Sequence, residues 1–119
     1  MTTASNKPRR AGIMGNGSSI AYTASKGALN TQTLVLARVL ALAVPVSAVC
    51  PVLVEQDFFE RLAPESFAER RARQITVSPL RRIGHPGEVA ETTHWLITGA
   101  SMMAGAIVEL DFSMHLNAV

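Results

Sequence analysis

The chain alternates between segments whose apolar residues recur with the period of a helix and two short runs rich in valine and isoleucine. The first periodic segment extends from Tyr22 to about Ala43, where leucine and alanine recur at intervals of three, four and seven residues. Additional valines broaden this apolar stripe, so we expect a helix that is buried on more than one side. Pro45 follows and is expected to end the helix.

The two short runs predict strands. Val46–Cys50, closed by Pro51, reads as a strand buried on both faces, and Ile107–Leu110 reads as a second short strand. Between them lie helical segments at Pro64–Gln74 and Pro86–Thr98. Strands this far apart in the chain need a crossover connection, which favours a parallel sheet. The pattern therefore predicts an α/β fold with about two strands and three to four helices.

The ends of these elements carry further signals. Gly99 is a plausible C-terminal cap for the last helix. We expect that helix to bury Val89, Thr93, Leu96 and Ile97. The first ten residues are polar and show no strand pattern, and the glycines and serines of Gly12–Ser19 predict a loop.

Composition narrows the class of protein. The 119 residues are enough for one domain, and 48% hydrophobic content with 17% charged residues predicts a buried core. No aromatic residues interleave with the basic clusters, so we predict no nucleic-acid partner. A lone cysteine, Cys50, and three dispersed histidines predict neither a disulfide nor a metal site. No signal peptide or membrane span is apparent, so a cytoplasmic protein without membrane contact is expected.

One pair of residues suggests chemistry. Tyr22 and Lys26 are four positions apart at the start of the long helix, which stacks phenol and ammonium on one face. A nearby ammonium favours the phenolate, so we expect the pKa of Tyr22 to lie below its ordinary value of about 10. Such a tyrosine can act as a general acid or base on an alcohol or carbonyl oxygen. The same spacing also arises by chance on ordinary solvated helices.

Four segments together resemble the C-terminal half of a short-chain dehydrogenase/reductase. In chain order they are Gly12–Gly15 with Ala21–Leu29, then Val46–Glu55, then Arg82–Ala90, and finally Gly105–Asp111. The resemblance implies a partial doubly wound, Rossmann-like parallel sheet whose N-terminal dinucleotide-binding half is missing. We therefore expect residues 1–119 to form a single truncated domain of this type, with residues 1–11 flexible.

The resemblance also implies roles for individual residues. Tyr22 would exchange the proton at the substrate oxygen, and Lys26 would lower the pKa of the tyrosine and hydrogen-bond the nicotinamide ribose. Pro51, Val52 and Val54 would hold the nicotinamide of NAD or NADP, with the Val54 backbone opposite its carboxamide. The substrate would be a small carbonyl compound or secondary alcohol.

The chain also departs from the family pattern. The glycine-rich turn that cradles the cofactor pyrophosphate is absent, and Arg9 stands where the catalytic serine is expected. Val52 replaces the glycine of a Pro-Gly turn, and Gln56 replaces a threonine. After Asp111, Phe112-Ser113 replaces a Gly-Gly pair.

These observations leave two hypotheses. In the first, the chain is an NAD(P)-dependent oxidoreductase, or the catalytic piece of one. In the second, it is a non-catalytic remnant or interaction module that associates with itself or with full-length relatives. An open strand edge and a broad apolar helix predict, in either case, a homo-oligomer or a partner-bound chain. A third reading, a small basic helical binding domain, is disfavoured by the ordered four-segment match.

Overall fold

The computed structural model describes residues 2–3, 20–55 and 57–117. In chain order the elements are β1 (Thr2–Thr3), α2 (Ile20–Val39), β2 (Ala48–Pro51), α3 (Asp57–Leu62), α4 (Pro64–Val77), α5 (Pro86–Thr98), β3 (Ile107–Leu110) and the 3₁₀ helix η1 (Met114–Asn117). The predicted α/β class is confirmed, and the helices starting at Pro64 and Pro86 begin where expected.

The strands form one parallel sheet in the order β1-β2-β3. β2 is central, with all four of its residues buried, and it pairs with β3 from Ala48 opposite Ile107 to Pro51 opposite Leu110. The expectation that the first ten residues carry no strand is wrong, because Thr2 and Thr3 pair with β2. The open edge of β2 has backbone N–H and C=O groups that need hydrogen-bond partners, and pairing with β1 supplies them. The two β-branched residues of β1 suit a strand even though no apolar alternation marks them in the sequence.

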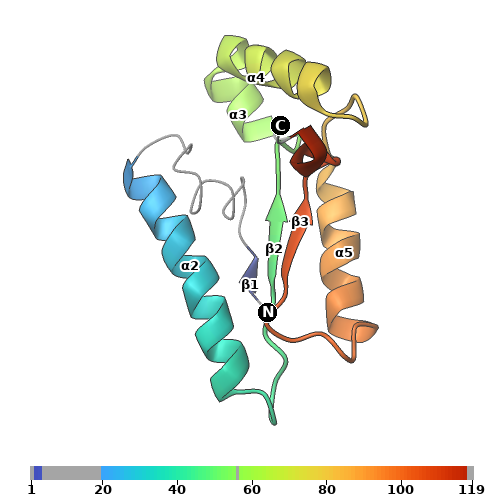
Figure 1. Ribbon diagram of the computed structural model, residues 1–119. Coiled ribbons are helices and arrows are strands. Elements are labelled where there is room, and N and C mark those ends of the chain that lie inside the picture. The colour runs from blue at the N-terminus through green and yellow to red at the C-terminus, as the bar shows by residue number, and fades with distance from the viewer. Residues whose placement is uncertain (1, 4–19, 56, 118–119) are drawn as a thin grey trace.

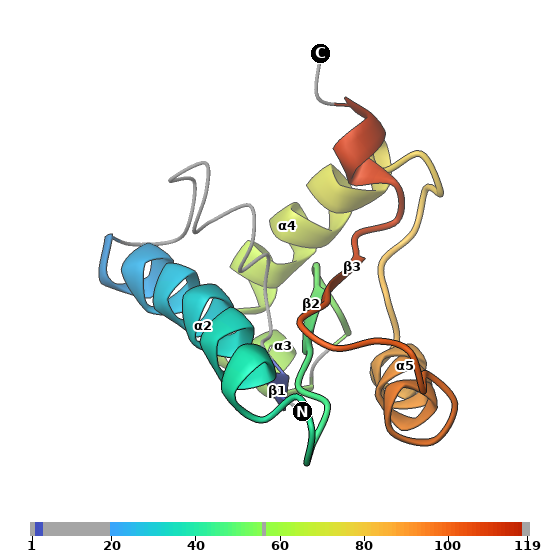
Figure 2. The ribbon, with the colours of Figure 1, turned by 60° about the horizontal axis from the view of Figure 1, so that its bottom comes forward.

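Helices cover the sheet on opposite sides. Figures 1 and 2 both show α2 on one side of the strands and α5 on the other. The strand order advances in one direction, from β1 through α2 to β2, and then through α5 to β3. The two crossovers therefore have opposite hands, although right-handed crossovers are the strong rule in parallel sheets.

The hydrophobic core cluster lies between the sheet and α5, and α2 buries two residues. Toward α5, Val49 is fully buried and packs with Leu96 and Ala100, and the partly buried Val108 joins this cluster. On α2, Thr33 and Ala37 are buried, and the Thr33 hydroxyl donates to the Leu29 carbonyl at 2.8 Å. The hydroxyl is satisfied within its own helix, so it can lie inside the protein without a desolvation penalty.

Several predicted details differ in the structure. α2 ends at Val39, four residues before Ala43, and the following residues form a turn in which the Ala43 and Val44 amides donate to the Leu40 carbonyl. On α5, Leu96 is buried but Ile97 is 69% exposed, so the expected burial of Ile97 is wrong. Neighbouring helical positions point about 100° apart, and here only the Leu96 direction meets the sheet.

Much of α2 also remains exposed. Its uncovered apolar residues include Leu34, Val35 and Val39, which are 51%, 51% and 72% exposed. Such a face is typical of a surface that contacts another protein. None of the helices in the described part of the chain has the length and hydropathy that a membrane span requires.

Candidate active site

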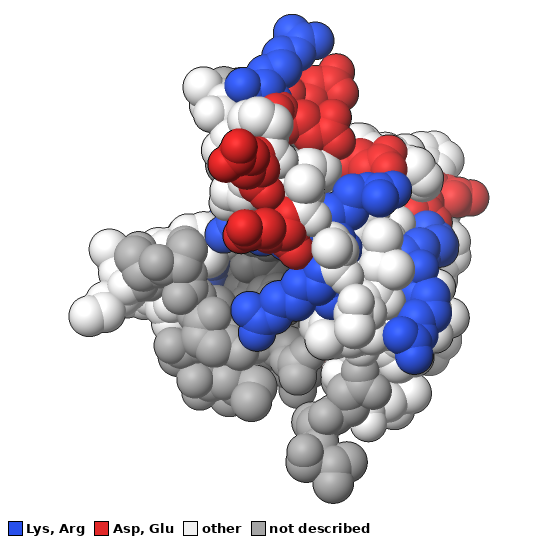
Figure 3. Space-filling view, turned by 90° about the horizontal axis from the view of Figure 1, so that it is seen from above, with Lys and Arg blue, Asp and Glu red and all other residues white. Residues whose placement is uncertain are grey.

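The candidate site lies at the carboxyl end of the parallel strands. Figure 1 shows the first turns of α2 at the level where β2 ends, with α3 and α4 just beyond that end. Seen from above, this end carries acidic side chains beside basic ones (Figure 3). Open parallel sheets bind their ligands at the carboxyl ends of their strands, so a binding or catalytic site is expected among these elements.

Tyr22 and Lys26 come together as the sequence predicted. Both lie in the first two turns of α2, and the Lys26 ammonium is over the phenol ring, 5.3 Å from its centroid. This is the geometry of a cation–π contact. The Ser25 hydroxyl donates to the Tyr22 carbonyl at 2.7 Å, which adds a local hydrogen bond to the first turns of the helix.

The electrostatics of Tyr22 differ from the prediction. Burial raises the pKa of the Tyr22 phenol above its ordinary value, and the positive charge of Arg70 on α4 opposes this shift less strongly. The expected depression of the pKa is therefore wrong. The reason is desolvation, because a partly buried phenolate loses more hydration than the surrounding cations return. Tyr22 is thus a neutral phenol near pH 7.

The segment that follows β2 presents backbone groups at the same carboxyl end of the sheet. Pro51 is the last residue of β2, and the Val52 amide donates to the Leu110 carbonyl at 3.1 Å. The side chains of Val52 and Val54 are buried. Among the described residues, none hydrogen-bonds to the backbone N–H or C=O of Val54. Within the described part of the chain, Val54 therefore offers one backbone donor and one backbone acceptor, which fit a primary amide group.

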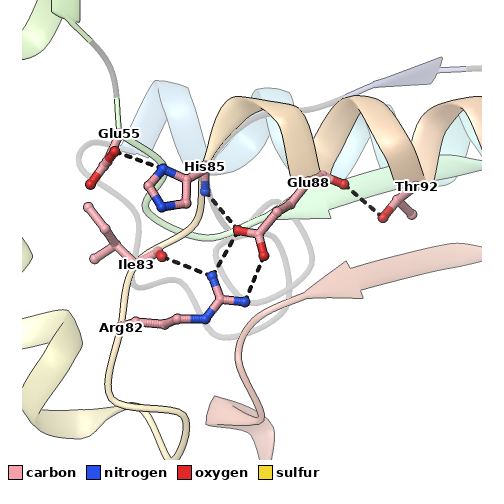
Figure 4. A network of polar contacts seen from close by, with 6 residues as sticks. All are labelled: Glu55, Arg82, Ile83, His85, Glu88 and Thr92. Atoms are coloured by element: carbon pink, nitrogen blue, oxygen red, sulfur yellow. Dashed lines mark hydrogen bonds and ion pairs between the residues drawn. The ribbon is translucent and has the colours of Figure 1, made fainter.

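A polar network that the sequence analysis did not identify lies beside this segment (Figure 4). Two nitrogens of Arg82 contact the two carboxylate oxygens of Glu88 at 2.9 and 2.6 Å. The backbone amide of His85 also donates to Glu88, at 2.9 Å. The hydrogen bond from Arg82, supported by that of the His85 amide, lowers the pKa of Glu88 to about 2. A glutamate three positions after the residue that precedes a helix is a recognisable capping signal.

Comparisons with known proteins identify the chain. A family model described as enoyl-(acyl carrier protein) reductase matches residues 3–115. A crystal structure of a short-chain dehydrogenase/reductase of the glucose/ribitol dehydrogenase type from Brucella melitensis superposes with a TM-score of 0.79 at 29% identity, covering 95% of this chain and 43% of the other. The chain belongs to the short-chain dehydrogenase/reductase family.

Curated members of the family agree. Galactitol 2-dehydrogenase of Rhizobium johnstonii is 38% identical over 93 residues, covering 76% of this chain and 35% of the relative. A protein named inactive 2-(S)-hydroxypropyl-CoM dehydrogenase 2, from Xanthobacter autotrophicus, is 32% identical over 108 residues, covering 87% of this chain and 47% of the relative. The chain thus spans less than half the length of these two relatives.

The two residues that follow Asp111 have an unusual backbone. Phe112 and Ser113, at the positions where the sequence resemblance implies a Gly-Gly pair, have positive φ angles of 52° and 63°. Glycine adopts this left-handed conformation freely, whereas other residues do so at a cost of about 1–2 kcal/mol each. The Phe112 ring gains contacts in return, because the Arg82 guanidinium lies 4.8 Å from its centroid and Gly84 leaves room for it. Arg9, at the expected serine position, lies outside the described residues.

Proposed function

We propose that the chain carries the proton-transfer part of an NAD(P)-dependent oxidoreductase acting on a carbonyl compound or secondary alcohol. The observation that supports this most is the placement of Lys26 over the Tyr22 ring in the first turns of α2, at the carboxyl end of the sheet. Family membership makes nicotinamide-dependent oxidoreduction the class of reaction to expect. The chain covers only part of its relatives, so the activity of a whole enzyme is part of the proposal.

Each residue would have a defined task. Reduced nicotinamide, when bound, supplies the hydride that adds to the carbonyl carbon. The Tyr22 phenol, which is protonated at neutral pH, would donate its proton to the carbonyl oxygen. The Lys26 ammonium would stabilise the phenolate left behind and hydrogen-bond the cofactor ribose.

The cofactor would rest on the segment after β2. The Val54 N–H and C=O, which have no hydrogen-bond partner in the described part of the chain, would bind the carboxamide. Pro51 and the buried Val52 would form the surface beneath the ring. The chain has no glycine-rich pyrophosphate turn, so most of the binding energy for the rest of the dinucleotide must come from elsewhere.

A second function has its own support. The exposed apolar face of α2 is typical of an interaction surface, and one family relative is named inactive. Arg9, where a serine is expected, lacks the hydroxyl that would orient a carbonyl. The chain would then be a non-catalytic module that binds a copy of itself or a longer relative.

Calorimetric titration with NADH and NADPH separates the two functions. Binding of either cofactor, together with carbonyl-dependent oxidation of NADH that is lost in Tyr22→Phe, supports the oxidoreductase. The Tyr22→Phe variant should still bind NADH, because the phenol acts on the substrate oxygen. The absence of any heat at millimolar cofactor would overturn independent catalysis and favour the interaction module.

A further inference from the structure

The peptide groups on either side of Val54 are both fastened to the segment that leads into α5. The Glu55 amide donates to the Gly84 carbonyl at 2.9 Å, and the Gly84 amide donates to the Leu53 carbonyl at 3.1 Å. Gly84 and Val54 thereby form an isolated parallel bridge. The Val54 side chain is buried, so the residue is held from both backbone directions and from its side chain.

Side chains add a second connection. The Nδ1 atom of His85 lies 2.8 Å from a carboxylate oxygen of Glu55. An imidazole can donate from Nδ1 whether it is neutral or protonated, so the contact does not depend on a particular charge state. Arg71 on α4 lies farther away, with its nearest nitrogen 4.0 Å from the other Glu55 oxygen.

His85 is itself held in place from the α5 side. Its backbone amide donates to the Glu88 carboxylate, which Arg82 grips with two nitrogens. Figure 4 shows the resulting path from Glu55 through His85 to Glu88 and Arg82. The pair of His85 and Glu55 thus connects the segment after β2 to the anchored N-terminal end of α5.

We propose that His85 and Glu55 are positioning residues that fix the Val54 peptide groups for binding of the nicotinamide carboxamide. This inference rests on the proposed function, since that function places the carboxamide at Val54. The physical reason is preorganisation, because a donor and an acceptor held in advance lose less entropy when the ligand binds. Both side chains are partly exposed, at 61% for His85 and 38% for Glu55, so a modest effect is expected.

Hydrogen exchange of the full 119-residue chain tests the positioning. In His85→Ala and in Glu55→Ala, the backbone amides of residue 55 and of Gly84 should exchange about two- to fivefold faster, which is the range that a partly exposed pair supports. His85→Asn keeps a donor near the Nδ1 position, and Glu55→Gln keeps an acceptor, so both should restore slow exchange. The Ala48 amide, which donates to Ala106 in the sheet, should be unchanged and reports on general destabilisation.

His94 provides a matched control. It is an exposed histidine on α5, and His94→Ala should leave the Glu55 and Gly84 amides at the wild-type rate. The positioning role is overturned if His85→Ala leaves these two amides unchanged, or if the Ala48 amide accelerates by the same factor.

Calorimetric titration with NADH then tests the connection to the cofactor. The dissociation constant should rise by a similar factor of about two to five in His85→Ala and return toward wild type in His85→Asn. An unchanged constant, despite faster exchange, overturns the role toward nicotinamide. Absence of NADH binding in the wild-type chain is a different failure, because it overturns the proposed function while the exchange data still decide whether the pair holds Val54.

Discussion

The Lys26 ammonium lies over the phenol ring of Tyr22, 5.3 Å from its centroid, and the two side chains rise from consecutive turns of α2. A second cation acts on the same phenol from a different element, since Arg70 of α4 lowers the pKa that burial raises. The surroundings of the phenol, which would transfer the proton in the proposed reaction, therefore depend on three things. These are the neighbouring Lys26 on α2, the partial burial of the ring and the charge of Arg70 on α4.

The ionisation of Tyr22 can be observed directly, because it is the only tyrosine in the chain. Absorbance at 295 nm should give a midpoint above the ordinary value, because burial raises the pKa of Tyr22. Arg70→Gln should move the midpoint higher still, whereas Arg73→Gln on the same helix should not. Folded protein favours the protonated phenol, so this contribution to stability is complete below about pH 10 and is lost as the pH rises further. A midpoint below the ordinary value would contradict the prediction.

The pairing of Glu88 with Arg82 predicts an acid-sensitive component of stability. The pKa of Glu88 is lowered to about 2, so the folded state favours the carboxylate. The stabilisation is present above the unfolded-state pKa of about 4.3 and disappears as the pH falls toward 2. Urea unfolding between pH 2 and pH 6 should therefore show a shallower acid dependence in Glu88→Gln than in wild type. Glu91→Gln, on the same helix and exposed, should keep the wild-type slope.

Neighbouring residues on α5 should respond very differently to truncation. Leu96→Ala should lower the free energy of unfolding by about 2–5 kcal/mol, because Leu96 is buried against Val49. Ile97→Ala should cost no more than about 0.5 kcal/mol, because Ile97 is 69% exposed. Denaturant unfolding monitored by circular dichroism measures both. Equal losses at the two positions would show that α5 is rotated relative to the described arrangement or covered by another surface.

Relief of the left-handed backbone after β3 should stabilise the protein. Ser113→Gly should raise the free energy of unfolding by about 0.5–1 kcal/mol, because φ is 63° there and the gain exceeds the entropy cost of glycine. Ser101 does not have a positive φ, so Ser101→Gly should be neutral or destabilising. Thermal unfolding of the two variants beside wild type makes the comparison. A loss of stability in Ser113→Gly would contradict the assigned cost.

The exposed face of α2 predicts self-association or association with a partner. Light scattering at micromolar concentration should give a mass above the 12.7 kDa of one chain. The double variant Val35→Lys, Val39→Lys should shift the chain toward the monomer, because both residues are at least half exposed on α2. Leu62→Lys on α3, also exposed, serves as the control and should retain the larger mass. A monodisperse wild-type monomer would contradict self-association.

Local signals predicted the element boundaries well. Pro64 and Pro86 begin α4 and α5, and Gly99 follows the end of α5, since proline favours the first helical turn and glycine the position after the last. The juxtaposition of Tyr22 and Lys26 was also predictable, because helical geometry brings residues four positions apart together. The end of α2 was placed too late, because its apolar pattern continues past Val39 into a turn.

Other features depended on contacts between distant segments. The pairing of Thr2 and Thr3 with β2 needs the free edge of a strand more than forty residues away, and no local pattern records that edge. The network joining Glu55 to His85 and Glu88 combines residues from the segment after β2 and from the start of α5. The shift in the pKa of Tyr22 is upward, opposite to the sequence-based prediction, for the same reason, because burial is a property of the packed molecule.

The sequence by itself determined the α/β class, the positions of the main helices and strands, the family resemblance, and the pairing of Tyr22 with Lys26. These follow from periodicity, turn chemistry and spacing along one helix, which are short-range properties of the chain. Only the tertiary structure decided the presence of strand β1, the opposite hands of the two crossovers, the raised pKa of Tyr22 and the polar connection that holds Val54. Those depend on which surfaces exclude water and which backbone groups meet across the fold, and such relationships exist only after the chain has packed.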